Sequence, residues 1–111
     1  MNAAAPPYSA IADPTRRRIL DLLRNGSLNA GMIARRFHGI SRPAVSKHLG
    51  ILRRSRLVVT QRNGRELLYS LNAAPLREVD AWLRRYEVFW GRQLESFKTH
   101  VESTPTKGDG P

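Results

Sequence analysis

The chain contains no cysteine, which excludes disulfide frameworks, thiolate metal sites and thiol catalysis. It also lacks the ~18 consecutive apolar residues of a transmembrane helix, and residues 1–7 carry neither the basic segment nor the apolar run of a signal peptide. Carboxylates are scarce: 9 Asp and Glu stand against 19 Lys and Arg among 111 residues, a formal net charge of +10. A hydrophobic share of 41% indicates one small soluble domain, which we expect in the cytoplasm.

The positive charge is confined to the first two-thirds of the chain. Residues 1–71 hold 13 Lys or Arg against three carboxylates, whereas residues 72–111 hold six of each. Such asymmetry predicts a segment that binds a polyanion, although a basic face kept only for solubility is an alternative. Five of the eight aromatic residues lie in the neutral part. A membrane-surface helix is therefore disfavoured, because it would place aromatic residues opposite a basic stripe.

Helix-start and helix-stop residues predict four helical segments in the first half of the chain. Asp13-Pro14 has the residue types of an N-cap and a first helical position. Ser27 or Asn29 can cap the third segment, and Ser41 can cap the fourth. With Asn25-Gly26 and residues 38–40 as breaks, the expected segments are 8–12, 14–24, up to Phe37, and 41 to about 55.

A hairpin and a long helix are predicted in the second half. Apolar residues alternate over residues 57–71, around an Asn63-Gly64 pair that is typical of a type I′ turn, which needs positive φ at both central residues. From Pro75 to about residue 102, apolar residues recur every three or four positions. That apolar stripe is too wide to be covered by one small domain. Residues 103–111 are predicted to be a disordered tail.

Two short helices, a tight turn and a basic hairpin predict a mainly α fold with a small antiparallel β-hairpin, a winged helix-turn-helix. In this motif the second helix enters the DNA major groove. On a helical wheel Val45, Leu49 and Leu52 share the inward face of residues 41–54, and polar residues occupy the opposite face. The expected DNA contacts lie on that polar face, its flanks and the hairpin tip: Ser41, Arg42, Pro43, Ala44, Ser46, Lys47, His48, Arg54, Arg62, Asn63 and Arg65.

Three motifs resemble the ArsR-type family of winged helix-turn-helix bacterial repressors: IADPTRRRIL at 11–20, SRPAVSKHL at 41–49 and RNGRELLYSL at 62–71. They occur in family order, and the resemblance covers roughly residues 8–100. It implies a homodimer that places a recognition helix in each half of a palindromic operator. The first and last helices would form the dimer interface, so the residues expected there are Tyr8, Ile11, Trp82, Tyr86, Phe89, Trp90 and Phe97.

The chain also departs from that family. Its metal sensors carry cysteines near the start of the helix before the recognition helix, where this chain reads LNAGM at 28–32, and the last helix offers only His100 beside Glu102. A metal site needs three or four ligands, so we expect no metal and no cofactor. Arg56 stands where family members often have glycine. If that position needs positive φ, arginine costs about 1 kcal/mol or more, so we expect the start of the hairpin to be built differently.

No pattern of catalytic residues is recognisable, so we expect no enzyme. Glu78, Asp80 and Glu87 are predicted to be salt-bridge partners of the neighbouring arginines rather than an acidic catalytic cluster. His48 is predicted to pack or to contact a phosphate, and His38 and His100 to be surface residues. The main alternative function is a basic architectural or RNA-binding module that does not read sequence. A winged helix used for protein–protein contacts is a third alternative, which the polar recognition face disfavours.

Overall fold

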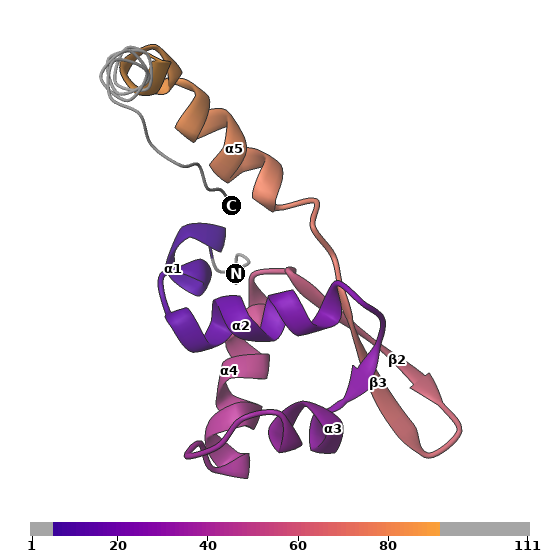
Figure 1. Cartoon of the computed structure of the whole chain (residues 1–111). Coiled ribbons are helices and arrows are strands. Elements are labelled where there is room, and N and C mark those ends of the chain that lie inside the picture. Colours follow the sequence, from indigo (N-terminus) through magenta and orange to yellow (C-terminus); the bar gives the residue numbers. More distant parts are fainter. Residues whose placement is uncertain (1–5, 92–111) are drawn as a thin grey trace, which may run out of the picture. The chain divides into compact units, whose positions relative to one another are not determined.

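The computed structural model describes residues 6–91, which form helices and a small sheet (Figure 1). The chain divides after Val79 into two units. The elements in chain order are α1 (Pro7–Ile11), α2 (Pro14–Leu23), β1 (Leu28–Asn29), α3 (Ala30–Arg35), α4 (Arg42–Arg54), β2 (Val58–Asn63), β3 (Glu66–Leu71) and α5 (Leu76–Arg84). Among the described residues, no helix is long and apolar enough to cross a membrane.

The predicted helix starts of α2, α3 and α4 are confirmed by their caps. In each case a side-chain oxygen accepts a hydrogen bond from the backbone N–H three residues later, at 3.0 Å for Asp13, 2.8 Å for Asn29 and 3.2 Å for Ser41. Asn29, and not Ser27, is therefore the cap of α3. Because each cap satisfies an N–H that the helix itself leaves unpaired, these three residues set where the helices begin.

The interior is formed by the inward faces of α2, α3 and α4 together with the start of β2. The predicted inward face of α4 is confirmed, since Val45, Leu49 and Leu52 are at most 1% exposed. They pack with the buried Ile19 of α2 and Ile33 of α3. Burial of each such side chain contributes about 1.5–3 kcal/mol, which fixes the rotation of α4 about its axis and leaves its polar face outside.

The sheet has one strand more than the predicted hairpin, in the order β1-β3-β2, with all pairs antiparallel. A two-residue strand such as β1 is too short to show an alternating pattern. The predicted turn is wrong in detail, because Asn63 pairs with Glu66 and the central turn residues are therefore Gly64 and Arg65. Of these two central residues, only Gly64 has positive φ, at 66°, as in a type II′ turn with glycine at its first central position. We call the β2–β3 hairpin the wing.

Arg56 lies between α4 and the wing with a φ of 65°, the only non-glycine residue with positive φ among those described. The Arg56 N–H donates to the carbonyl of Arg53 at 2.9 Å, and the Leu57 N–H donates to that of Leu52 at 3.0 Å. This pair of bonds is the Schellman motif that usually ends a helix on glycine. The expectation of a differently built hairpin start is therefore wrong: arginine adopts the conformation that glycine would favour.

Arg56→Gly is accordingly expected to stabilise the protein by about 1 kcal/mol, because it relieves the left-handed strain of a residue with a Cβ. For a domain of this size that gain raises Tm by roughly 4–8 °C. Arg53→Gly, at an exposed position inside the same helix, is the matched control and should destabilise the protein by about 1 kcal/mol. Thermal unfolding followed by circular dichroism measures both. An Arg56→Gly protein no more stable than the wild type would contradict the strain argument.

The predicted continuous helix over residues 75–102 is interrupted within the described residues. After α5, Arg85 and Tyr86 form a turn, and residues 87–91 are helical again. The Arg85 and Tyr86 N–H groups donate to carbonyls three residues back, at 3.1 and 2.9 Å, the tighter pattern of a 3₁₀ turn. No glycine or proline marks this turn. Residues 92–102 and the predicted tail, 103–111, lie outside the described residues.

Candidate nucleic-acid interface

The second helix of the helix-turn-helix presents a polar face built by its own sequence. α3 ends at Arg35, the following turn includes Gly39 with a φ of 81°, and Ser41 caps α4. With one side of α4 buried, the residues predicted to face DNA fall into two groups. The exposed ones are Ser41, Arg42, Pro43, Ser46, Lys47 and Arg54, while Ala44 and His48 are half-buried.

The wing carries the other predicted DNA-contacting residues at its tip. Arg62, Asn63 and Arg65 are all exposed there. The Arg62 guanidinium donates at 3.5 Å to the carbonyl of Arg65, which is itself one of the two central residues of the turn. The tip therefore presents two guanidinium groups on a short hairpin, an arrangement suited to phosphate oxygens.

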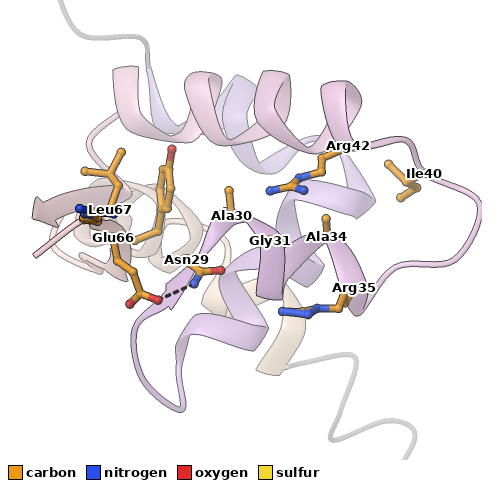
Figure 2. Close-up of a pocket in the computed structure, with 11 residues that line it drawn as sticks. Asn29, Ala30, Gly31, Ala34, Arg35, Ile40, Arg42, Glu66 and Leu67 are labelled. Carbon is orange, nitrogen blue, oxygen red and sulfur yellow. Dashed lines mark hydrogen bonds between the residues drawn. The ribbon is translucent and has the colours of Figure 1, made fainter. Parts of the chain in front are cut away.

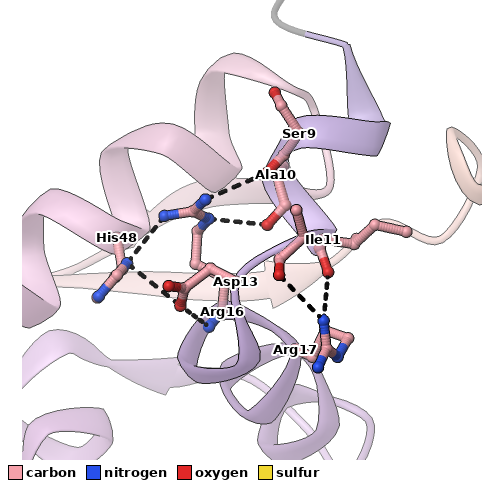
Figure 3. A network of polar contacts seen from close by, with 8 residues as sticks. Ser9, Ala10, Ile11, Asp13, Arg16, Arg17 and His48 are labelled. Carbon is pink, nitrogen blue, oxygen red and sulfur yellow. Dashed lines mark hydrogen bonds and ion pairs between the residues drawn. The ribbon is translucent and has the colours of Figure 1, made fainter.

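A polar network that the sequence did not reveal holds His48 of α4 (Figure 3). Arg16 of α2 donates to the α1 carbonyls of Ala10 at 2.7 Å and Ser9 at 3.2 Å, and its Nη1 lies 3.1 Å from His48 Nδ1. An arginine can only donate, so His48 Nδ1 accepts and its proton is on Nε2. Arg16 thereby ties the C-terminal end of α1 to the middle of α4, and Nε2 is the His48 nitrogen left to face another partner.

Asp13 completes this network from the N-cap of α2. Its carboxylate accepts the Arg16 backbone N–H, which holds the pKa of Asp13 below its usual value, and the positive charge of the Arg16 guanidinium lowers it further. The same carboxylate lies 4.0 Å from His48 Nδ1. One aspartate thus caps α2 and faces the histidine of α4. The Asp13-Pro14 signal identified the cap, but the long-range contact to residue 48 has no counterpart in local sequence.

Most of the predicted interface aromatics are solvent-exposed. In the second unit, the Trp82 and Tyr86 rings are 5.4 Å apart edge to face, and Phe89 follows at 6.2 Å from Tyr86. Phe89 and Trp90 are 55% and 46% exposed. In the first unit Tyr8 is exposed and its hydroxyl donates to the Glu78 carbonyl at 3.2 Å, while Ile11 is half-buried. Phe97 lies outside the described residues.

One of the salt bridges predicted for the last helical segment is present in the structure. Asp80 accepts a hydrogen bond from Arg84 at 2.9 Å, which raises the pKa of Arg84. The pair joins residues four apart on one helix face. Within residues 6–91, no group of three or more His, Asp or Glu side chains could hold a metal ion. His100 and Glu102 lie outside the described residues.

Known proteins resemble this chain both in sequence and in fold. A model described as a helix-turn-helix domain matches residues 11–61. The transcriptional repressor SdpR of Bacillus subtilis is 43% identical over 79 residues, which cover 71% of this chain and 87% of SdpR. The HTH-type transcriptional regulator Rv2034 of Mycobacterium tuberculosis is 38% identical over 96 residues, 86% of each chain.

A solved structure agrees with this relationship. An ArsR-like transcriptional regulator from Rhodococcus sp. RHA1 superposes with a TM-score of 0.69 at 33% identity and covers 90% of this chain and 91% of its own. The matched part contains the helix-turn-helix, whose second helix exposes a basic, polar face. The chain therefore belongs to the ArsR family of winged helix-turn-helix regulators, which bind DNA and regulate transcription.

Proposed function

We propose that the protein is a homodimeric repressor that binds a palindromic operator in the cytoplasm and occludes the promoter. The observation that carries this proposal is α4 itself, whose apolar side is buried and whose capped, polar side is exposed. Such a helix has the form of one that enters the major groove. The relative SdpR is named a repressor, which favours repression over activation. We propose no catalysed reaction, because binding accounts for the whole site.

The two DNA-contacting elements have different roles in this proposal. Residues of the first turns of α4 reach base edges, with Arg42, Ser46 and Lys47 as the reading residues. Arg62 and Arg65 of the wing contact phosphates or the minor groove. The remaining contacts to the DNA are Ser41, Pro43, Ala44, His48 through Nε2, Arg54 and Asn63. Base contacts specify the sequence and phosphate contacts supply affinity.

The dimer in this proposal is held by the exposed aromatic residues of the last helical segment together with Tyr8 and Ile11. A two-fold dimer uses the same surface on both copies, and it presents two α4 helices to half-sites about one helical turn of DNA apart. Any signal that changes the geometry of the dimer would change that spacing. The arginine network from α1 to α4 supports this coupling, because Arg16 contacts both helices.

A selection of bound sequences from a random DNA pool tests the proposal. We expect an enriched palindrome that the protein binds at least about 10³-fold more tightly than random duplex at the same salt concentration. The alternative, a basic architectural or RNA-binding module, is favoured only by the net charge of +10. It predicts no enriched motif and nearly equal affinity for all duplexes. Equal affinity for operator and random DNA would refute sequence-specific regulation.

A further inference from the structure

A groove of about 730 Å³ lies between α3, the start of α4 and the wing (Figure 2). Its volume falls within the range of small-molecule sites, roughly 300–1,000 Å³. Its walls come from three elements that the described chain brings together only on folding: Gly31 and Ala34 from α3, Arg42 from α4, and Leu67 and Tyr69 from β3. The proposed DNA contacts account for Arg42 and Arg65 but leave the rest of the groove without a role.

The groove has a positive lining. Arg35, Arg42 and Arg65 face it from the end of α3, the start of α4 and the tip of the wing. Glu66 is the one carboxylate among its lining residues, and it already accepts a hydrogen bond from the Asn29 amide at 3.0 Å. In the part of the chain that the structure describes, none of the three guanidinium groups forms an ion pair. The groove therefore offers unpaired donors to an anion.

Gly31 leaves room for the Arg42 guanidinium in this groove. A Cβ built on Gly31 would lie 3.2 Å from Arg42 Nη2, so any larger residue at position 31 would press on the guanidinium. Figure 2 shows the Arg42 side chain pointing across the groove toward α3. An anion in the groove would therefore meet the Arg42 guanidinium beside α3.

The groove also has apolar side chains in its lining. Ala34 and Ile40 lie on the side of α3 and the turn, and Leu67 lies on the wing. A bare inorganic anion would leave this surface uncovered. A ligand that carries one anionic group and an apolar body would satisfy both parts of the lining.

We propose that this groove binds a small organic anion, a carboxylate or phosphate on an apolar body, and that its binding competes with operator DNA. The anionic group pairs with Arg42 and Arg35, and the apolar body covers Ala34 and Leu67. Competition rests on the proposed function, because Arg42 and Arg65 are also proposed DNA contacts. A guanidinium that is bound to the ligand is withdrawn from the DNA. The ligand thus competes directly with DNA for the same arginines, and this competition needs no change in the geometry of the dimer.

Ligand binding is tested first without DNA, by ¹⁵N NMR titration of the full chain with phenyl phosphate. Saturable shifts are expected for the amides of Gly31, Ala34 and Leu67. Inorganic phosphate, which lacks the apolar body, should bind at least tenfold more weakly, and benzyl alcohol, which lacks the charge, should not bind. Equal binding of the two phosphates reduces the groove to a subsite for the DNA backbone and overturns the proposal, as does the absence of saturable shifts.

Two neighbouring arginines provide the matched variants. Arg35→Gln removes a charge from the groove, whereas Arg36→Gln removes the same charge from a separate hollow beside Phe37. We expect Arg35→Gln to weaken phenyl phosphate binding about tenfold, the usual effect of losing a charge-assisted hydrogen bond, and Arg36→Gln to leave it within twofold. Equal weakening in the two variants would show that only the overall charge matters.

Competition is then measured with the selected operator at constant ionic strength. Phenyl phosphate should raise the operator Kd of the wild type and of Arg36→Gln by the same factor, and that of Arg35→Gln much less. Ligand binding without any change in the operator Kd overturns competition. If the chain bound no DNA specifically, the NMR titration would still decide the ligand site, so the two proposals fail separately.

Discussion

Phe89→Lys is expected to convert the proposed dimer into monomers and to lower operator affinity by 10²-fold or more. Phe89 is 55% exposed and continues the ring contacts of Trp82 and Tyr86. An obligate dimer interface buries about 2,000 Å² or more around an apolar centre, and a lysine there would be buried without a partner. Two half-sites bound by linked copies gain avidity of about 10²–10⁴, which separated monomers do not have. Trp90→Lys should act in the same way.

Lysine is the informative substitution because it adds positive charge, so general electrostatics cannot explain weaker DNA binding. Val59→Lys is the matched control: Val59 is 47% exposed and lies on β2, outside the proposed interface. It should remain a dimer. Sedimentation equilibrium at micromolar concentration gives the masses, and circular dichroism shows that each variant is folded. A wild-type protein that sediments as a monomer would rule out the dimer, and a dimeric Phe89→Lys would exclude this surface from it.

Features that depend on neighbours in sequence were predictable from the residues. The caps Asp13 and Ser41 were found because the donor that each one satisfies lies three positions away. The inward face of α4 was found because burial repeats at helical spacing. The motifs at 11–20, 41–49 and 62–71 lie largely within α2, α4 and the wing. The resemblance to the family is therefore visible in the sequence alone.

Features that depend on long-range pairing were not predictable. Strand β1 exists only because Leu28 and Asn29 pair with β3, some forty residues later. Asn63-Gly64 favours a type I′ turn by itself, but the register of β2 and β3 moves the turn by one residue and leaves Asn63 in the strand. The contact between Arg16 and His48 spans 32 residues. In each case the partner is chosen by packing, which a local pattern does not record.

The candidate site shows the same division. Exposure of the polar face of α4 and of the wing tip follows from the helical wheel and from the hairpin, and the structure places both as expected. The position of the Arg42 guanidinium against Gly31 does not follow from either, because it depends on how closely α3 approaches the start of α4. The sequence shows that position 31 is a glycine, but it does not show that the Arg42 side chain occupies the space beside it.

The two elements proposed to contact DNA should respond differently to removal of their charged groups. Lys47→Ala, in the first turns of α4, should weaken operator binding by about 1–3 kcal/mol and random-duplex binding much less, because alanine cannot make the hydrogen bond to a base edge. Arg42→Ala should do the same. Arg53→Ala is the control on the same helix, since Arg53 is exposed but lies outside the proposed contacts.

In the wing, Arg62→Ala combined with Arg65→Ala should weaken operator and random duplex alike. The slope of log K against log salt should fall by about one for each phosphate that the variant no longer neutralises. Fluorescence anisotropy with both duplexes at several salt concentrations separates the two patterns. If Lys47→Ala and Arg42→Ala weakened binding to operator and random DNA equally, α4 would contact only the backbone. Reading of the sequence would then have to be assigned to the wing, whose tip exposes Arg62 and Arg65, or to the shape of the DNA.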